Sequence, residues 1–381
     1  MNYRCLGKTG LKVSEIGFGG EWLERHTTEE CSELISMAQA AGINILDCWM
    51  ASPTVRSNIG VGIKGNRSHW IIQGHIGSTW QNGQYERSRD VERCKVAFND
   101  LLERLGTDYI DLGMIHYIDE QKEWDKVLDS EYLKYVYRLK DEGVIKHIGM
   151  STHNPKIARQ AVESGIVEMI LFSINPAFDM LPPCESIDDI FNEEYKDENL
   201  NGINIERSNL YKLCEKENVG ITVMKGFAGG RLFDSQQSPF GVALTPVQCL
   251  HYALTRPAVA SVMVGYDSPK HIVDALAYET ANADEKDYAS VLANAPKHSY
   301  KGQCTYCGHC APCPQHIDIA MVNKLYDLAT MQPTIPESLL NHYKNLSHHA
   351  DECLNCHACE SRCPFGVNIS ARMNAIAKLF V

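Results

Sequence analysis

Cysteine spacing is the feature of this sequence that most clearly indicates chemistry. The chain has fifteen cysteines in 381 residues, and eight of them form two tight groups after residue 300. The first group is Cys304, Cys307, Cys310 and Cys313, and the second is Cys353, Cys356, Cys359 and Cys363. In a compartment that keeps thiols reduced, clustered cysteines indicate metal binding before disulfides. The last part of the chain is therefore predicted to bind metal.

Each group is a C-x2-C-x2-C run that ends in a further cysteine followed by a proline, Pro314 or Pro364. This pattern resembles that of the bacterial ferredoxins that hold two [4Fe–4S] clusters. The resemblance implies crossed ligation, in which the last cysteine of each run binds the other cluster. One cluster is then held by Cys304, Cys307, Cys310 and Cys363, and the other by Cys353, Cys356, Cys359 and Cys313. The alternative is a pair of structural zinc sites with four cysteines each, although zinc ribbons usually show two separated C-x2-C knuckles.

The elements that precede the cysteines alternate between strand-like and helical patterns. The apolar, strand-like runs are Ile16–Gly20, Asn44–Asp47, Trp70–His75, Ile110–His116, His147–Thr152, Val167–Ile174, Gly220–Lys225 and Ala260–Gly265. Helical patterns between them include Cys31–Ala41, Val91–Leu105, Tyr132–Asp141, Pro155–Glu163 and Ile272–Ala281. Eight βα repeats over about 270 residues predict an α/β fold of the (β/α)8, or TIM-barrel, class.

The predicted organisation is a barrel over residues 1–295 and a small α-helical, ferredoxin-like domain over residues 296–381. No internal repeat is expected beyond the βα period. The acidic stretch Pro182–Arg207 is too long for an ordinary βα loop, and we expect it to cover the top of the barrel.

Polar side chains stand at the ends of most predicted strands. They are Glu21, Asp47, His75, His116, His153, Asn175 and Lys225. Any one of them could be a buried, satisfied polar residue. Because the carboxyl ends of the strands of a TIM barrel meet at one mouth, their convergence predicts a functional site there.

Four segments resemble the aldo/keto reductase family: Gly7–Gly20, Ala41–Asp47, Leu105–His116 and Lys140–Gly149. The resemblance covers about residues 2–290, and one branch of that family carries a ferredoxin-like C-terminus. Members of the family use an Asp–Tyr–Lys–His tetrad, in which Tyr is the general acid, Lys lowers its pKa, Asp pairs with Lys, and His orients the carbonyl. The resemblance implies roles for Asp47 and His116, which match the Asp and the His.

The chain departs from the tetrad at its other two positions. Ser52 stands where the Tyr is expected, and His75 stands where the Lys is expected. A serine hydroxyl is a poor proton donor at neutral pH, whereas a histidine titrates near neutrality. We therefore expect His75 to handle the proton, with Asp47 fixing its tautomer and Ser52 as a weaker candidate. A metal held by Asp47, His75 and His116 is the alternative, because two His and a carboxylate can form a facial triad.

The resemblance also implies NADP(H) in the barrel. Glycine-rich loops after the seventh and eighth strands would hold its phosphates, and the residues expected there are Lys225, Gly226, Gly229, Gly230, Arg231, Gly265, Ser268 and Lys270. Ser151 and Asn154 are expected at the nicotinamide end. The alternative is that these glycines only close tight βα turns.

Charge and hydropathy exclude some partners. The formal charge of −12 argues against a nucleic-acid partner that binds by phosphate neutralisation. No apolar run approaches the ~18 residues that a membrane span needs, and the first residues lack a signal-peptide core. We therefore expect a cytoplasmic protein.

The leading prediction is an iron–sulfur oxidoreductase. A small, carbonyl-type organic substrate and NADP(H) would bind at the barrel mouth, while two [4Fe–4S] clusters relay single electrons to or from a redox protein. Three alternatives stay open. They are an NADPH-dependent carbonyl reductase with structural clusters, a non-enzymatic electron-transfer subunit, and a non-redox lyase or isomerase that uses the Asp/His site.

Overall fold

The computed structural model describes residues 1–185, 200–298, 300, 302–331 and 333–380. Eight parallel strands close into a barrel, as predicted. In spatial order they are β3 (Ile16–Gly19), β4 (Ile45–Cys48), β5 (Ile71–Ile76), β8 (Ile110–Ile115), β9 (Ile145–Thr152), β10 (Met169–Ser173), β11 (Gly220–Met224) and β12 (Val259–Gly265). Each overlaps one of the predicted apolar runs, because strands covered on both faces need apolar side chains throughout.

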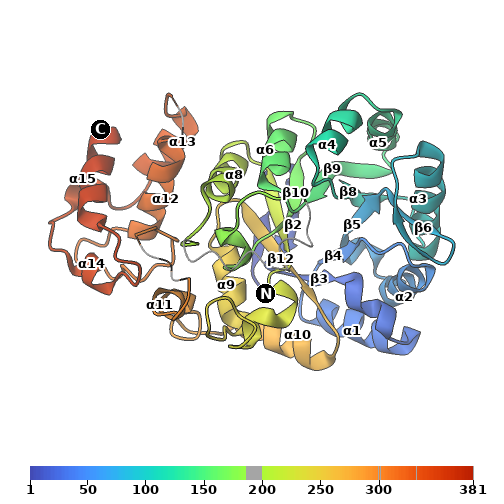
Figure 1. The fold of residues 1–381 in the computed structure, drawn as a ribbon, viewed down its shortest axis with the longest axis horizontal. Coiled ribbons are helices and arrows are strands. Elements are labelled where there is room, and N and C mark those ends of the chain that lie inside the picture. The colour runs from blue at the N-terminus through green and yellow to red at the C-terminus, as the bar shows by residue number, and fades with distance from the viewer. Residues whose placement is uncertain (186–199, 299, 301, 332, 381) are drawn as a thin grey trace.

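Helices surround the barrel (Figure 1). They are α1 (Thr28–Ala40), α2 (Pro53–Ile63), α3 (Val91–Leu105), α4 (Gln121–Leu128), α5 (Glu131–Asp141), α6 (Pro155–Glu163), α8 (Ile205–Lys216), α9 (Pro246–Leu254), α10 (Pro269–Leu276) and α11 (Tyr288–Ala293). Helix α3 illustrates the local causes: Asp90 caps its first turn, Gly106 ends it at φ 62°, and Phe98 and Leu101 bury one face. Of the stretch expected to cover the barrel, residues 186–199 lie outside the described residues, and α8 begins at Ile205.

The interior of the barrel has an apolar lower layer and a polar upper layer. The lower layer includes Ile45, Leu112, Met114, Met169 and Met263. Side chains two positions apart on a strand share a face. Ile45 is therefore followed on the same face by Asp47, and Met114 by His116, so the upper layer of polar residues lies at the carboxyl ends of the strands.

Two antiparallel hairpins flank the barrel at opposite ends. Strands β1 (Tyr3–Cys5) and β2 (Lys12–Ser14) pair near the amino ends of the barrel strands, and Leu6 and Val13 join the interior apolar layer. Strands β6 (Ser78–Gln81) and β7 (Gln84–Arg87) follow β5 at the mouth. Their turn residues Asn82 and Gly83 have φ of 52° and 80°, the conformation of a tight type I′ hairpin turn.

The C-terminal part is built from two similar halves, which corrects the expectation of no further repeat. In each half, a cysteine run leads into a helix: α12 (Ile319–Ala329) after the first run and α15 (Ile369–Leu379) after the second. Asp318 and Asn368 cap these helices in the same way. The remaining elements are α13 (Glu337–Lys344), α14 (Ala358–Arg362) and the 3-10 turn η8 (Ala350–Glu352).

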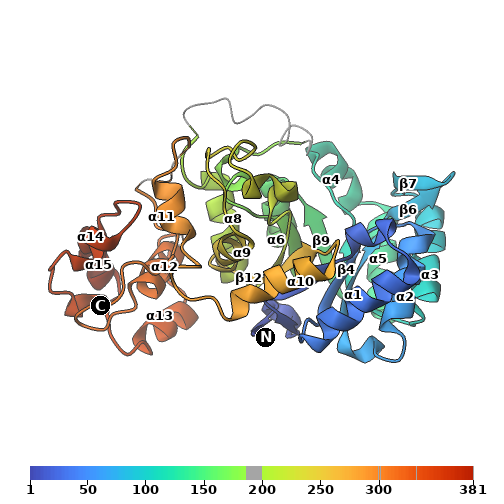
Figure 2. The same cartoon turned by 90° about the horizontal axis from the view of Figure 1, so that it is seen from below.

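Helices α12 to α15 lie on one side of the barrel, next to α8, α9 and α11 (Figures 1 and 2). Helix α12 packs against α8, where Lys324 forms an ion pair with Glu215 at 2.9 Å. Among the described residues, no helix is both long and apolar enough to span a membrane.

Candidate functional site

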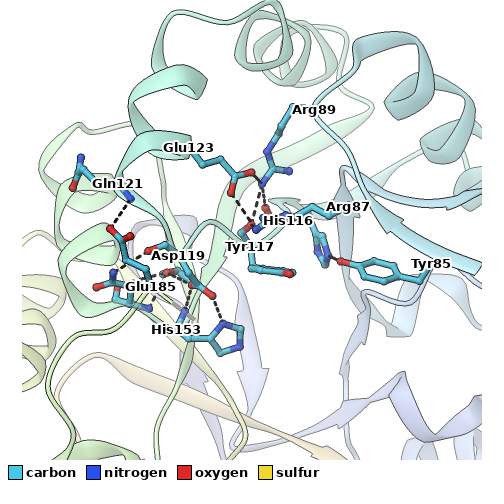
Figure 3. Close-up of polar contacts among 12 residues, drawn as sticks. Tyr85, Arg87, Arg89, His116, Tyr117, Asp119, Gln121, Glu123, His153 and Glu185 are labelled. Atoms are coloured by element: carbon cyan, nitrogen blue, oxygen red, sulfur yellow. Dashed lines mark hydrogen bonds and ion pairs between the residues drawn. The ribbon is translucent and has the colours of Figure 1, made fainter. Parts of the chain in front are cut away.

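A chain of hydrogen bonds runs through the polar layer of the barrel mouth. The Nε2 atom of His75 lies 3.0 Å from the Oδ1 atom of Asp47. The Nδ1 atoms of His75 and His116 are 2.9 Å apart, and the Nε2 atom of His116 lies 2.6 Å from the hydroxyl of Tyr85. Figure 3 shows Tyr85 directed at His116 from the hairpin. The structure therefore brings together three of the four predicted catalytic residues and adds a phenol.

Gln73 and Thr222 fix the Asp47 end of this chain of hydrogen bonds. The side-chain amide of Gln73 donates from Nε2 to the Oδ1 atom of Asp47 at 2.7 Å, and its Oε1 atom accepts from the Thr222 hydroxyl at 2.8 Å. Asp47, His75 and His116 are all buried. Burial, together with His75 and Arg89, holds the pKa of His116 well below its ordinary value, so this imidazole is neutral at neutral pH.

Ser52 occupies a different place. It is buried at the N-cap of α2, where its side chain makes no capping hydrogen bond. Among the described residues, the hydrogen bonds of the relay join Asp47, His75, His116 and Tyr85 and do not involve Ser52. Tyr85 was not among the predicted residues, although the Asn82-Gly83 dipeptide between two short polar strands is a strong hairpin signal that could have placed it at the mouth.

His153 belongs to a second, separate pair. Its Nδ1 atom lies 2.8 Å from the Oδ2 atom of Asp119, and the other carboxylate oxygen accepts from the His153 backbone and from Thr152. Burial favours the neutral carboxyl, but His153 outweighs it and lowers the pKa of Asp119. Asp119, which the sequence did not single out, thus fixes the turn that follows β9.

Two other strand-end residues have local structural contacts. Asn175 donates to the carbonyl of Lys225 and accepts from two backbone N–H groups, so it shapes the turn after β10. Glu21 is exposed on the 3-10 segment η2 (Gly20–Arg25), away from the relay, because the chain turns outward directly after β3.

The nicotinamide-side candidates differ in their contacts. Asn154 caps α6 and donates to the carbonyl of Asp119, so its amide is already used. Within the described chain, the hydroxyls of Ser151 and Ser173 are buried and lack hydrogen-bond partners. Because Ser151 pairs in register with Leu171 of the interior layer, both hydroxyls face the barrel interior. Buried, unpaired hydroxyls of this kind fit a polar ligand group such as a carboxamide.

The phosphate-side candidates cluster after β11 and β12. Lys225, Gly229 and Gly230 have φ of 60°, 67° and 89°, and a Cβ atom on either glycine would meet open space. The two glycines leave the loop surface open to a ligand, although the Gly230 N–H already donates to the carbonyl of Phe227 at 2.9 Å. Gly226 and Arg231 belong to the same loop. Gly265 ends β12 under Trp22, Ser268 caps α10, and Lys270 pairs with Asp274.

The two cysteine groups have matching backbone conformations. In the first group Tyr306 and Gly308 have φ of 56° and 85°, and in the second Asn355 and His357, at the equivalent positions, have φ of 52° and 56°. Alternation of right- and left-handed residues turns successive N–H groups inward, as in the concave anion sites that hold iron–sulfur clusters. The backbone therefore fits the charge of a thiolate-bound cluster in both halves.

The cysteine runs also cross over. A hollow is lined by Cys313 together with Cys353, Cys356 and Cys359. The segment around Cys363 meets the first run instead, since Arg362 donates to the Cys310 carbonyl at 2.7 Å. Burial, together with the nearby Cys304 and Cys307, raises the pKa of Cys310 to about 12.

Within the described residues, no group of three or more His, Cys, Asp or Glu side chains is arranged to hold a single metal ion. At the barrel mouth, the donor atoms of Asp47, His75 and His116 are directed at one another.

Comparison with known proteins decides the family. The model described as "Aldo/keto reductase family" matches residues 15–245, which is more than half of the chain. The chain belongs to the aldo/keto reductase family. The model described as "4Fe-4S dicluster domain" matches residues 300–367, so this aldo/keto reductase carries an iron–sulfur domain. Both resemblances drawn from the sequence are confirmed.

Individual relatives of this aldo/keto reductase are distant. It is 32% identical to the aldo-keto reductase YhdN of Bacillus subtilis over 40% of its own length and 47% of the relative's. It is 29% identical to L-galactose dehydrogenase of Arabidopsis thaliana over 48% of its length and 61% of the relative's. The matched region thus spans roughly half of these relatives. The chain is also similar to the structure of aldo-keto reductase AKR11C1 from Bacillus halodurans, with a TM-score of 0.59 and 22% sequence identity. The alignment covers 79% of this chain and 98% of the AKR11C1 chain, which shows the shared fold.

Proposed function

We propose that this protein is an iron–sulfur oxidoreductase that reduces or oxidises a small carbonyl-type substrate at the barrel mouth. The observation that carries the proposal is the buried Asp47–His75–His116 chain at the barrel mouth. It is supported by the resemblance, in which Asp47 and His116 match the family's Asp and His, and His75 stands in place of its Lys. Such a chain can donate or accept a proton at a substrate oxygen. Two [4Fe–4S] clusters, with the crossed cysteine ligation given above, would supply or remove single electrons.

The two cysteine groups differ in exposure, which supports an order of electron transfer. Thr305 in the first group is 1% exposed, whereas Leu354 at the equivalent position of the second group is 63% exposed. Arg256 of the barrel donates to the Thr305 carbonyl at 2.5 Å. In our proposal a redox protein meets the second group, and the first group passes electrons between that group and the barrel.

The barrel residues predicted to bind a cofactor fit NADP(H). Ser151 would meet the carboxamide, and the loop of Lys225, Gly226, Gly229, Gly230 and Arg231 would meet the phosphates, with Gly265, Ser268 and Lys270 along the adenosine side. When bound, the nicotinamide supplies or accepts a hydride. The free Ser151 and Ser173 hydroxyls favour a second candidate function, an NADPH-dependent carbonyl reductase with structural clusters. We further propose a cytoplasmic location, where reduced thiols persist.

Replacement of one cluster ligand tests the leading function against the second candidate. Iron-reconstituted wild type, Cys307→Ser and Cys356→Ser are assayed anaerobically with benzaldehyde and methylglyoxal, using NADPH or reduced methyl viologen as donor. The wild type should contain about eight iron atoms per chain and each variant about four.

The leading function predicts that both variants lose viologen-driven turnover while their far-ultraviolet circular dichroism is unchanged. Unchanged NADPH-driven turnover in both variants would favour the carbonyl reductase with structural clusters. A wild type that converts neither probe with either donor would contradict both candidates.

A further inference from the structure

Tyr85 is the only phenol bonded to the histidine relay among the described contacts at the mouth, and it comes from an unexpected element. In the family the acid follows the strand that ends in Asp47, whereas Tyr85 lies on β7 of the hairpin after β5. Its hydroxyl lies 2.6 Å from the Nε2 atom of His116. The ring packs edge-on against Trp49 at 5.5 Å between centroids, and Trp49 in turn stacks on His116 at 6.1 Å.

Several contacts fix the hairpin that carries Tyr85. Ser78 donates to the carbonyl of Trp49 at 2.5 Å, which ties the start of β6 to the end of β4. The Ser88 N–H donates to the carbonyl of Gly77 at 2.9 Å, closing the base of the hairpin. Gly77 has φ of 96°, and a Cβ there would stand 2.7 Å from the Ser88 carbonyl, so only glycine fits.

The far strand of the hairpin is held to the loop after β8. Arg89 donates to the carbonyl of His116 at 2.6 Å, and Arg87 donates to that of Tyr117 at 3.2 Å. Both guanidinium groups pair with Glu123 of α4, at 3.1 Å for Arg87 and 3.0 Å for Arg89 (Figure 3). The position of the Tyr85 hydroxyl relative to His116 is therefore set by anchors on three elements of the barrel.

We propose that Tyr85 is the catalytic group that exchanges the proton with the substrate oxygen, and that His75 and His116 are positioning residues that resupply it. The proposal rests on the proposed function, since it requires a carbonyl or alcohol at the mouth. It places the general acid of this aldo/keto reductase on the β6–β7 hairpin in place of the Ser52 position.

The observed distances allow a balanced proton transfer. The proposal requires His75 to carry a hydrogen on each ring nitrogen before the reaction, so that Nε2 donates to Asp47 at 3.0 Å and Nδ1 donates to His116 at 2.9 Å. Neutral His116 then carries its hydrogen on Nε2 and donates to the Tyr85 oxygen, which leaves the phenol hydrogen free to face the substrate. Burial raises the pKa of Tyr85, so the phenol keeps its proton until a basic oxygen arrives.

During reduction the Tyr85 O–H bond breaks and the substrate O–H bond forms. The Nε2 hydrogen of His116 moves to the phenolate, and the Nδ1 hydrogen of His75 moves to His116, so one proton leaves the relay and one imidazolium becomes neutral. The electron pair would come from the donor of the proposed function. A bound nicotinamide would supply it as a hydride, whereas two bound clusters would supply two single electrons, with the carbon-bound proton taken from water, which leaves hydroxide. Both routes need the proton on oxygen.

The test compares wild type with Tyr85→Phe, which keeps the ring and removes only the hydroxyl. The matched control is Tyr137→Phe on the outer face of α5, where the tyrosine is 40% exposed. Turnover of benzaldehyde and methylglyoxal is measured with NADPH and with reduced methyl viologen between pH 6 and pH 9. Both variants keep the other charged or titratable groups near the relay. These are Arg87, Arg89, Tyr117, Asp119, Glu123 and His153.

In the Tyr85→Phe variant we expect kcat to fall at least about 100-fold, with KM within about threefold of wild type. Wild-type kcat should fall as pH rises and the relay loses its proton, and this dependence should disappear in the variant. The iron content of Tyr85→Phe should match that of wild type. The Tyr137→Phe control should match wild type in kcat, KM and pH profile. A Tyr85→Phe enzyme with wild-type kcat and pH profile would overturn the assignment while leaving the proposed function intact. A wild type inactive on both probes would instead overturn the proposed function and, with it, the role of Tyr85.

Discussion

At the scale of single residues, His75 stands where the family has its lysine, and in our proposal it passes a proton toward Tyr85, which does the work of the family's tyrosine. Its imidazole contacts Asp47 on one side and His116 on the other. A lysine at this position could hold a neighbouring phenol in its charged form, but it could not pass a proton onward through two ring atoms. In our proposal the replacement therefore changes a residue that tunes an acid into a residue that passes a proton.

Removal of the charge of Asp47 tests this role. In Asp47→Asn the imidazolium form of His75 loses its counter-ion, so we expect kcat on the carbonyl probes to fall about 100-fold at pH 7. The loss should be smaller at lower pH, because a higher proton concentration favours the doubly protonated ring that the Asp47 carboxylate otherwise stabilises. Asp108→Asn, at an exposed position ahead of β8, is the matched control. Equal kcat in Asp47→Asn and wild type across the pH range would remove Asp47 from the mechanism.

At the scale of elements, a half-buried carboxylate joins helix α5 to strands β9 and β10. Glu168 accepts from Lys140 at 2.5 Å, from the Ile148 N–H at 3.1 Å, and pairs with His147 at 2.8 Å. Burial opposes its ionisation, but these partners outweigh that cost and lower the pKa of Glu168 to about 2. The folded state therefore favours the charged form more than the unfolded chain does.

Glu168→Gln should lower the free energy of unfolding by about 2 kcal/mol at pH 7. Because the folded pKa is depressed, the contribution of Glu168 is complete above its ordinary pKa of 4.5 and is lost as pH falls toward about 2. The difference between wild type and variant, measured by urea denaturation under anaerobic conditions, should thus be constant from pH 6 to pH 8 and shrink below pH 4.5. If the difference in the free energy of unfolding grew toward acid pH, the folded state would raise the pKa of Glu168, which would contradict this account.

The strands and helices followed from sequence patterns, because apolar runs and amphipathic periods reflect burial directly. The convergence of Asp47, His75 and His116 followed from the same logic, since all three end parallel strands. Tyr85 could not be linked to His116 in this way, because their contact depends on how a hairpin folds over the mouth. The pairing of His153 with Asp119 depends likewise on the conformation of one turn.

At the scale of the whole molecule, a buried polar network joins the barrel to the first cysteine group. Asp179, which follows β10, accepts from Tyr211 and Tyr252, and its Oδ1 atom lies 3.6 Å from Arg207. Tyr252 contacts Tyr300, whose hydroxyl donates to the carbonyl of Pro176 at 2.7 Å. Arg256 extends the network to Thr305, between Cys304 and Cys307.

Loss of the Asp179 carboxylate should weaken both parts of the molecule. In Asp179→Ala the buried Arg207 loses its counter-charge, so we expect the free energy of unfolding to fall by about 3 kcal/mol. The variant should also lose iron faster than wild type when a chelator is added, because Thr305 lies within the first cysteine run. The exposed Asp284→Ala is the matched control. If Asp179→Ala is destabilised but loses iron no faster than wild type, the network does not contribute to holding the clusters.

In our proposal, electrons held by clusters at the cysteine groups reach a carbonyl at the barrel mouth. The most direct test is a single turnover: the protein is reduced with dithionite, freed of excess reductant and mixed anaerobically with benzaldehyde. Cluster reoxidation is followed by absorbance and electron paramagnetic resonance, and benzyl alcohol is quantified. We predict reoxidation of the clusters with about one alcohol formed per two electrons lost, and much slower reoxidation in Tyr85→Phe. Clusters that stay reduced while NADPH alone converts benzaldehyde would contradict the claim.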